Sequence, residues 1–320
     1  MQTHAATLDD VMAKGFVSCG VNHGLPGFSS SNEQGAWRGM DADLCRGLAA
    51  AIFGDPEKVK FIPLTAKERF TALQSGEVDV LSRNTTWTMT RDTALGLHFA
   101  GVTYYDGQGF MVHKKLGVES VLELSGATIC TQSGTTTEMN VSDFFDTKKM
   151  PFKLLTFDKT EESVQAYEAG QCSAFTADAS QLYAFRLNLA EPDDHIVLPE
   201  IISKEPLGPV VRQGDDQWFN LVKWTVFALI DAEELGITSS NIDEMRSSEN
   251  PAVRRLLGVE GDLGRKLGVD NDWAVRLIKA IGNYGEMFNR NVGTESPLNI
   301  ARGINKLWTD GGILYAPPLR

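Results

Sequence analysis

The sequence predicts a two-lobed α/β protein in which each lobe is built from alternating strands and helices. Residues 16–91 carry strand and helix signals in turn, and residues 127–178 repeat the same order of elements. This alternation is typical of a parallel sheet covered by helices. A length of 320 residues suffices for two lobes with separate hydrophobic cores. No residue-level repeat is visible, so the duplication is one of architecture.

The first lobe begins with a strand at 16–21 and a glycine-rich loop at 24–39. A helix follows over 41–53, and the acidic residues Asp41 and Asp43 in its first turn suit the positive end of the helix dipole. A strand, a helix and a second strand are expected next, at 58–63, 66–75 and 78–81.

A polar stretch follows the strand at 78–81 and leads to Arg91. It is rich in hydroxyl and amide side chains, namely Ser82, Asn84, Thr85 and Thr86. Open α/β sheets bind ligands at the carboxyl ends of their strands. The guanidinium of Arg91 offers a planar fork that matches a carboxylate. The stretch therefore predicts a receptor for the carboxylate of a small molecule.

The second lobe begins after a strand at 110–113 and contains a second polar patch, Thr131-Gln-Ser-Gly-Thr-Thr-Thr137. This patch follows a strand at 127–130 and opens a helix, where backbone N–H groups and the helix dipole favour an anion. The alternative is an ordinary helix cap, with Thr135 as the capping residue and Glu138 completing a capping box. The two roles are compatible.

The last strand of the second lobe, 173–177, ends at Asp178, after a strand at 154–157 and a helix at 160–169. A carboxylate at this position suits an ammonium group, but it suits equally the cap of a helix over 180–187. An anion site and a carboxylate on opposite sides of a cleft match the two ends of an amino acid, whose charges need partners once they are desolvated.

The chain returns to the first lobe through residues 207–212 and continues into a long helix at 216–235. Helical periodicity recurs at 252–257, 273–288 and 300–307. The two crossings predict a first lobe of residues 1–110 and 212–320 and a second lobe of residues 111–211. Two crossings between lobes are typical of a hinge that closes on a ligand.

Composition excludes several classes of protein. The net charge of −12, without any basic run, argues against nucleic acid as a partner. No apolar run approaches the roughly 20 residues that span a bilayer. Catalytic motifs, nucleotide-binding motifs and metal-ligand spacings are absent, so no cofactor and no metal are expected. Residues 1–6 lack signal-peptide features, which leaves open a cytoplasmic protein or a mature form whose signal was removed.

The four cysteines fall in pairs, one pair in each predicted lobe: Cys19 with Cys45, and Cys130 with Cys172. Buried free thiols, which behave as small hydrophobic side chains, are one interpretation. Two disulfides within the lobes, formed in an oxidising compartment, are the other. The residues alone leave both open.

Several further side chains have a functional and a structural interpretation. Arg69 and Arg83 can point either to a ligand or to solvent, and a solvated face is the better prediction for both. The aromatic residues Trp37, Phe28 and Trp87 lie in predicted loops, where small core clusters explain them more simply than a ligand pocket does.

Five segments have a specific order and spacing over residues 15–215. They are Gly39-Met-Asp-Ala-Asp-Leu-Cys45, Ala72-Leu-Gln-Ser-Gly-Glu-Val-Asp79, Asn84-Thr-Thr-Trp-Thr-Met-Thr-Arg91, Ser133-Gly-Thr-Thr136 and Ala174-Phe-Thr-Ala-Asp178. Together they resemble a known family, the periplasmic solute-binding proteins of ABC transporters for polar amino acids, and most closely its general L-amino-acid-binding branch. The resemblance implies the periplasmic-binding-protein fold with two crossover hinge strands, and a helical C-terminal extension typical of the longer branch.

The resemblance also implies roles for individual residues. Arg91 matches the arginine that binds the ligand α-carboxylate, and Asp178 matches the aspartate that binds the α-ammonium. The remaining ligand-binding candidates are strand-end or helix-start groups, Asn84, Thr86, Thr135 and Thr136, together with Arg69, which in relatives for acidic amino acids binds the side-chain carboxylate. Arg69 therefore favours glutamate, aspartate and their amides.

The chain departs from the family at Asn22 and Leu25, where some relatives have a charged and an aromatic residue. Asn22 stays a ligand-binding candidate, but stacking on the ligand side chain is not expected. The family location in the periplasm favours the disulfide interpretation, with Cys19–Cys45 and Cys130–Cys172 as the implied pairs.

The resemblance implies a monomeric protein that is not an enzyme, binds a free L-amino acid and delivers it to the permease subunits of an ABC transporter. Two alternatives share the scaffold. A dehydratase of the prephenate or arogenate type needs a carboxylic acid in the cleft and no ammonium-binding aspartate. A sensor domain of a receptor needs a membrane segment or a signalling module, and neither is visible in the sequence.

Overall fold

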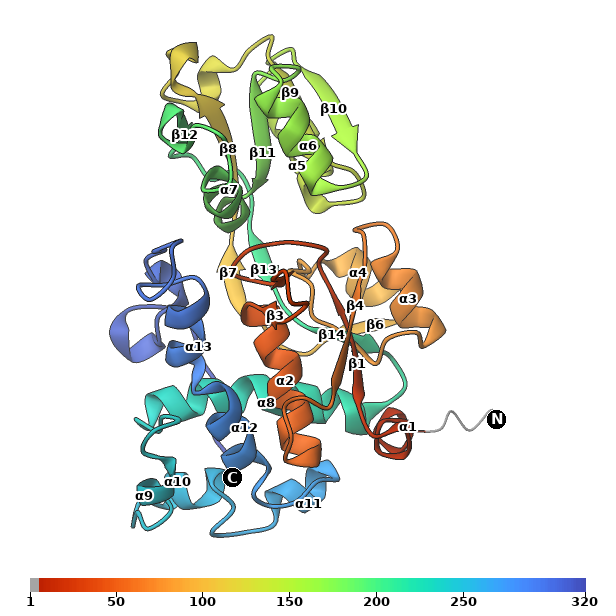
Figure 1. Ribbon diagram of the computed structural model, residues 1–320, viewed down its shortest axis with the longest axis vertical. Coiled ribbons are helices and arrows are strands. Elements are labelled where there is room, and N and C mark those ends of the chain that lie inside the picture. Colours follow the sequence, from red (N-terminus) through yellow and green to blue (C-terminus); the bar gives the residue numbers. More distant parts are fainter. Residues whose placement is uncertain (1–5) are drawn as a thin grey trace. The chain divides into compact units, whose positions relative to one another are not determined.

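The computed structural model describes residues 6–320 and consists of two compact units (Figure 1). The first unit comprises the chain up to Pro63, Phe70–Tyr104 and Gly208–Arg320. The second unit comprises Leu64–Arg69 and Tyr105–Leu207. The lobe boundaries predicted from the sequence, at residues 110 and 212, stay a prediction. Residues 1–5, part of the stretch without signal features, lie outside the described residues.

The first unit contains a five-stranded sheet with the strand order β4-β1-β5-β14-β6. The strand β1 (Val17–Val21), second in this order, is parallel to both β4 (Val59–Pro63) and β5 (Val80–Leu81). The strand β14 (Val210–Arg212) is antiparallel to β5 and to β6 (Leu97–Phe99). The sheet is therefore mixed, whereas the sequence predicted a parallel one. Only strands joined by a crossover helix must run parallel, and β14 follows no such helix.

The second unit repeats this plan with the strand order β10-β9-β11-β8-β12. The strand β9 (Thr128–Gln132) is parallel to β10 (Lys153–Phe157) and to β11 (Ala174–Asp178). The strand β8 (Gln108–His113) is antiparallel to β11 and to β12 (His195–Val197). This sheet is also mixed. The architectural duplication predicted from the order of elements is confirmed by the two equivalent sheets.

Two short sheets complete the strands. The chain leaves the first unit through β7 (Tyr104–Asp106) and returns after β13 (Glu205–Leu207), and these two strands pair with each other. They are the two crossover strands that the sequence predicted. A hairpin of β2 (Ser30–Ser31) and β3 (Trp37–Arg38) forms within the glycine-rich loop of the first unit.

Most of the predicted helices form close to their expected positions. The first unit has α1 (Thr7–Lys14), α2 (Met40–Phe53), α3 (Arg69–Ser75), α4 (Met89–Ala94), α8 (Asp216–Glu234), α9 (Ile242–Met245), α10 (Pro251–Leu256), α11 (Leu263–Leu267), α12 (Trp273–Ile281) and α13 (Tyr284–Asn291). The second unit has α5 (Thr136–Thr147), α6 (Thr160–Glu168) and α7 (Ala179–Arg186). Among these helices, α1, α4, α9 and α11 were not predicted. Short 3-10 turns occupy 114–116, 121–123, 192–194, 303–305 and 308–310.

The C-terminal extension belongs to the first unit, where α12 packs along α2 (Figure 1). Gly47 permits this approach, because a Cβ at that position would lie 2.6 Å from side-chain atoms of Leu277 and of Ile281. The predicted continuous helix at 273–288 is interrupted after Ile281, where Asn283 caps α13. The helix expected at 300–307 is wrong, since only a 3-10 turn forms there.

Each unit has its own apolar core, and each core contains one disulfide. Cys19 on β1 is bonded to Cys45 on α2, and Cys130 on β9 is bonded to Cys172 at the start of the segment leading to β11. The two pairings implied by the family resemblance are confirmed. Each bond joins an interior strand of the sheet to another segment of the same unit, at sequence separations of 26 and 42 residues.

Candidate functional site

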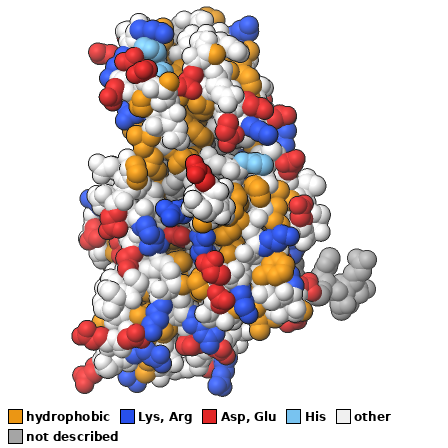
Figure 2. All heavy atoms as spheres, viewed as in Figure 1, with side chains coloured by type: hydrophobic (Ala, Val, Ile, Leu, Met, Phe, Trp, Pro, Cys, Tyr) orange, Lys and Arg blue, Asp and Glu red, His pale blue; other side chains and the backbone are white. Residues whose placement is uncertain are grey.

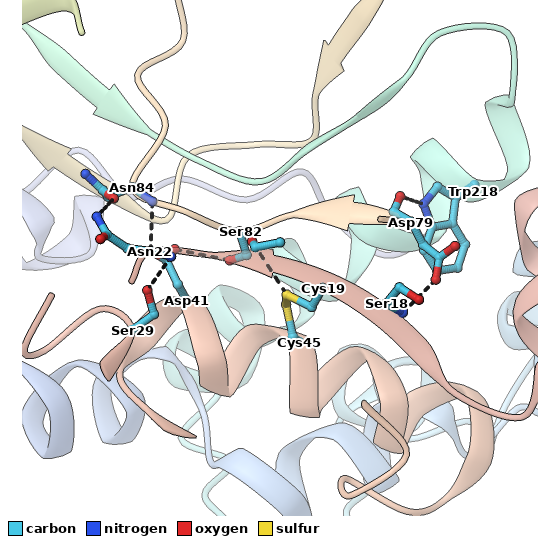
Figure 3. Close-up of a disulfide and its surroundings, with 11 residues drawn as sticks. Ser18, Cys19, Asn22, Ser29, Asp41, Cys45, Asp79, Ser82, Asn84 and Trp218 are labelled. Atoms are coloured by element: carbon cyan, nitrogen blue, oxygen red, sulfur yellow. Dashed lines mark hydrogen bonds between the residues drawn. A yellow bond between two sulfur atoms is a disulfide. The ribbon is translucent and has the colours of Figure 1, made fainter. Parts of the chain in front are cut away.

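The polar stretch after β5 is held in place by an aspartate from the next layer. Asp41, in the first turn of α2, accepts hydrogen bonds from the Ser82 hydroxyl (3.1 Å) and from the backbone N–H of Asn84 (2.8 Å) (Figure 3). Asn84 has a φ of 36°, in the left-handed region that asparagine tolerates better than most residues. Burial raises the pKa of Asp41 to about 6, although both hydrogen bonds favour its charged form.

Asn22 lies beside Asn84, as Figure 3 shows. Its side-chain nitrogen donates to the Asn84 amide oxygen over 3.1 Å, and its backbone N–H donates to the Ser29 hydroxyl over 2.9 Å. Both asparagines are buried at the carboxyl ends of neighbouring parallel strands, β1 and β5. The structure thus brings together two of the predicted ligand-binding residues from parts of the chain that are about 60 residues apart.

Arg91 lies in the helix α4, not in a loop as the sequence predicted. Thr88 caps this helix by accepting the backbone N–H of Arg91. The guanidinium donates to the carbonyl oxygen of Thr86 over 2.8 Å and lies 5.2 Å from the ring centre of Phe70. A carbonyl and an aromatic face both help to orient the guanidinium. Arg91 and Thr86, both predicted site residues, are therefore in direct contact.

The start of α5 forms the second predicted patch. Thr135 caps the helix by accepting the backbone N–H of Glu138, and its hydroxyl donates to the carbonyl of Gln132 over 2.7 Å. The carboxylate of Glu138 accepts from the backbone of Gly134, so the reciprocal half of the predicted capping box does not form. The hydroxyl of Thr136 donates to Glu205 over 2.9 Å. Because both threonine hydroxyls already donate within the second unit, the backbone N–H groups at this helix start are the better anion donors.

Asp178 ends β11 and is 3% exposed. It occupies the capping position of α7, but its side chain makes no capping bond and instead accepts the Gln181 amide over 2.7 Å. Asp178 therefore has the predicted cap position without the side-chain hydrogen bond of a cap. Burial raises the pKa of Asp178 well above its usual value, and the negative charges of Asp106 and Glu205 raise it further. The carboxylate lies where a positive group is electrostatically favoured.

Asp106 and Glu205 are two acidic residues of this region that the sequence analysis missed. Asp106 accepts backbone N–H groups of Gly107 (2.8 Å) and Ser180 (3.3 Å), and burial raises its pKa to about 6. Glu205 accepts the side chains of Thr136, Asn140 and Ser203. Single acidic residues beside a crossover strand carry no motif. Their positions next to the two predicted crossings were the only available signal.

The two arginines expected on solvated faces are buried. Arg69 is 3% exposed and Arg83 is 2% exposed, so the solvent interpretation is wrong for both. Arg69 begins α3 and belongs by its contacts to the second unit, where its positive charge opposes the burial that raises the pKa of Asp178. Local periodicity did not reveal this, because the burial comes from residues distant in the sequence.

The aromatic residues of the first unit are mainly structural. Phe28 packs edge-on against Tyr104 with ring centres 5.3 Å apart, Trp37 packs against Phe61, and Trp87 stacks on Phe99 at 5.5 Å. These contacts agree with the predicted core clusters. Leu25 is fully buried and pairs through its backbone with Ser29.

Metal sites and membrane-spanning helices are both absent from residues 6–320. No group of three or more histidine, cysteine, aspartate or glutamate side chains in this range is arranged to hold a metal ion. No helix in the same range is long and apolar enough to cross a membrane. On the face drawn in Figure 2, basic and acidic side chains are interspersed.

Two α/β units of equivalent topology, with polar side chains at the ends of their parallel strands, define a ligand-binding protein. Residues 17–239 match the model of the bacterial extracellular solute-binding proteins, family 3. The chain belongs to this family.

Relatives match over almost the whole chain. The general L-amino acid-binding periplasmic protein AapJ of Rhizobium johnstonii is 62% identical, over 99% of this chain and 93% of its own. The glutamate/glutamine/aspartate/asparagine-binding protein BztA of Rhodobacter capsulatus is 55% identical, over 99% of this chain and 94% of its own. A solved periplasmic binding protein of an ABC transporter from Brucella ovis, with glutathione bound, is 60% identical with a TM-score of 0.97 and covers 99% of this chain and 100% of its own.

Proposed function

We propose that this protein binds free L-amino acids outside the cytoplasm and delivers them to the permease subunits of an ABC transporter. The observation that carries the proposal is a pair of opposite charges. Arg91 of the first unit is a buried guanidinium that donates to the Thr86 carbonyl and lies against the Phe70 ring, and Asp178 of the second unit is buried near other carboxylates. An α-carboxylate and an α-ammonium complement these two groups.

The other candidate residues complete the proposed site. In the first unit, Asn22, Asn84 and Thr86 hold the backbone atoms of the ligand. In the second unit, the helix start at Thr135 and Thr136 adds donors to the carboxylate through its backbone. Arg69 binds the side-chain carboxylate or amide, which favours glutamate, aspartate, glutamine and asparagine. The relative BztA is named as a binding protein for these four amino acids.

The location and partners of the protein follow from the same proposal. Relatives named as periplasmic support a periplasmic location, and the two disulfides suit that oxidising compartment. We propose that the protein is a monomer and that it binds its permease while the ligand is enclosed. The named relatives are binding proteins rather than enzymes, so a dehydratase of the prephenate or arogenate type is not favoured.

A second candidate ligand is glutathione, because a relative of 60% identity was solved with it bound. Its γ-glutamyl end carries the same α-carboxylate and α-ammonium as a free amino acid, so both ligands suit Arg91 and Asp178. The two ligands differ in size, because the site must also accommodate the rest of the peptide when glutathione binds.

A thermal-shift screen of the twenty amino acids and glutathione tests both candidates, with calorimetry on each ligand that raises Tm. We expect shifts with glutamate, glutamine, aspartate and asparagine. A shift with glutathione alone favours the second candidate, and no shift with any of these compounds contradicts the proposed function.

A further inference from the structure

Three carboxylates of the second unit, Asp106, Asp178 and Glu205, lie on elements that the sheet topology brings together. Asp106 ends β7 and Glu205 begins β13, and these two strands pair. Asp178 ends β11 directly opposite Gln108, two residues after Asp106. Asp106 also accepts the backbone N–H of Ser180, two residues beyond Asp178. The structure therefore gathers three acidic groups around one position.

Charges of both signs act on Asp178. Asp178 is influenced by the negative charges of Asp106 and Glu205, and the positive charge acting on it is that of Arg69. Glu205 accepts hydrogen bonds from three side chains, those of Thr136, Asn140 and Ser203. Asp106 and Asp178 are thus two buried carboxylates beside a third that is fixed by hydrogen bonds. Buried carboxylates close to one another do not all ionise, and one of them keeps a proton.

We propose that Asp106 is a second carboxylate of the ammonium site, sharing a proton with Asp178 in the ligand-free protein, and that binding of an amino acid ammonium releases this proton to water. The inference rests on the proposed function, because the ammonium is that of the ligand. One positive charge enters as one proton leaves, so the net charge of the group is unchanged. Amino-acid binding is then coupled to proton release at acidic pH.

The direction of the pH effect follows from burial. Burial raises the pKa of Asp106 to about 6, and it raises the pKa of Asp178 above its usual value as well. Below pH 6 the group carries the extra proton, which the ligand must displace, so affinity rises with pH by up to about tenfold per pH unit. Near pH 7.5 less proton release is expected, since more of the group is already ionised.

Calorimetry with L-glutamine tests the coupling, because this ligand has no side chain that titrates between pH 5 and 8. Binding is measured near pH 5.5 and near pH 7.5, each in two buffers with different heats of ionisation. We expect the heat to depend on the buffer near pH 5.5, with release of up to about one proton, and to depend on it less near pH 7.5. Equal heats in both buffers near pH 5.5 overturn the proposal.

Variants test whether the released proton comes from the group that contains Asp106. Asp106→Asn should bind L-glutamine more weakly near pH 7.5, and the binding that remains near pH 5.5 should release less than half as many protons. Asp231→Asn is the matched control: Asp231 is another buried aspartate with a raised pKa, on α8 of the first unit, and its replacement should leave the proton release unchanged. Unchanged proton release in Asp106→Asn shows that Asp106 has only a structural role and overturns the assignment.

The experiment distinguishes failure of the proposed function from failure of the proton coupling. If Asp106→Asn does not fold, as judged by circular dichroism, Asp106→Ser retains an acceptor for the Gly107 N–H and takes its place, with the same expected loss of proton release. Failure of L-glutamine to bind the unaltered protein at either pH contradicts the proposed function itself. Binding without proton release contradicts only the coupling.

Discussion

The carboxylate of Asp41 accepts a 2.8 Å hydrogen bond from the backbone N–H of Asn84, which joins the first turn of α2 to the residue that follows β5. The same carboxylate accepts the Ser82 hydroxyl. A helix residue therefore fixes the backbone of the strand end where Asn22, Asn84 and Thr86 are proposed to meet the ligand. Second-layer contacts of this kind set how well a binding site is oriented.

Asp41→Ala should weaken amino-acid binding by on the order of tenfold, about 1.4 kcal/mol, because Asn84 loses the acceptor that holds its left-handed conformation. Calorimetry on the variant measures this loss, and circular dichroism checks that the fold is kept. Asp43→Ala is the matched control, since Asp43 lies on the same helix but bonds Arg290 and Asn291 of the C-terminal extension. An equal loss of affinity in both variants argues against a specific role for Asp41.

Arg91→Ala should abolish detectable amino-acid binding, because the ligand carboxylate loses its charged partner, a contact that is typically worth 2–5 kcal/mol or roughly 30- to 5000-fold in affinity. Calorimetry measures the effect. Arg254→Ala removes an arginine from a partly exposed ion pair with Glu260 and serves as the control, with unchanged binding expected. Unaltered affinity in Arg91→Ala means that the carboxylate lies elsewhere.

Arg69→Ala should weaken glutamate binding more than alanine binding, because only glutamate carries a side-chain carboxylate for this guanidinium. We expect at least about a tenfold difference between the two losses, or about 1.4 kcal/mol. Calorimetric titrations of both ligands on both proteins give the comparison. Equal losses remove the reason to assign acidic ligands to Arg69 and leave it a structural role in the second unit.

The two disulfides should each stabilise the protein by roughly 3–4 kcal/mol through the chain entropy of the unfolded state, since they close loops of 26 and 42 residues. Urea unfolding of Cys19→Ala/Cys45→Ala and of Cys130→Ala/Cys172→Ala measures this. Thiol titration of the unfolded, unreduced protein should find no free cysteine. Four reactive thiols in that titration contradict both bonds.

Asp231 should make the folded protein less stable as the pH rises from about 4 to about 7. Burial raises its pKa from 3.8 to about 7, so the folded chain binds more protons than the unfolded chain within this window. The penalty is fully present above pH 7 and disappears below pH 4. Asp231→Asn should therefore raise the free energy of unfolding at pH 8 by about 1 kcal/mol, after allowance for solvent screening. Urea unfolding at pH 4.5 and 8 tests this, and Glu234→Gln, which removes the neighbouring negative charge, should give a smaller gain.

The sequence by itself determined the order of strands and helices, because alternation of apolar runs, capping residues and glycines is a local signal. It also indicated Arg91 and Asp178, since polar residues that follow apolar strands stand out in the chain. The two disulfide pairs were implied by the resemblance to the family. The residues alone left open whether the cysteines are free thiols or disulfides. All of these rest on features that are read within short stretches or within known motifs.

The tertiary structure decided what depends on contacts between distant residues. Asp41 looked like a residue that complements a helix dipole, yet it holds the loop after β5. Arg69 and Arg83 looked solvated, yet both are buried, because burial is set by neighbours that local periodicity does not contain. The antiparallel strands β8 and β14 and the gathering of Asp106, Asp178 and Glu205 likewise depend on the two crossings of the chain between the units. Strand direction and electrostatic environment are properties of the folded chain, and no local pattern encodes them.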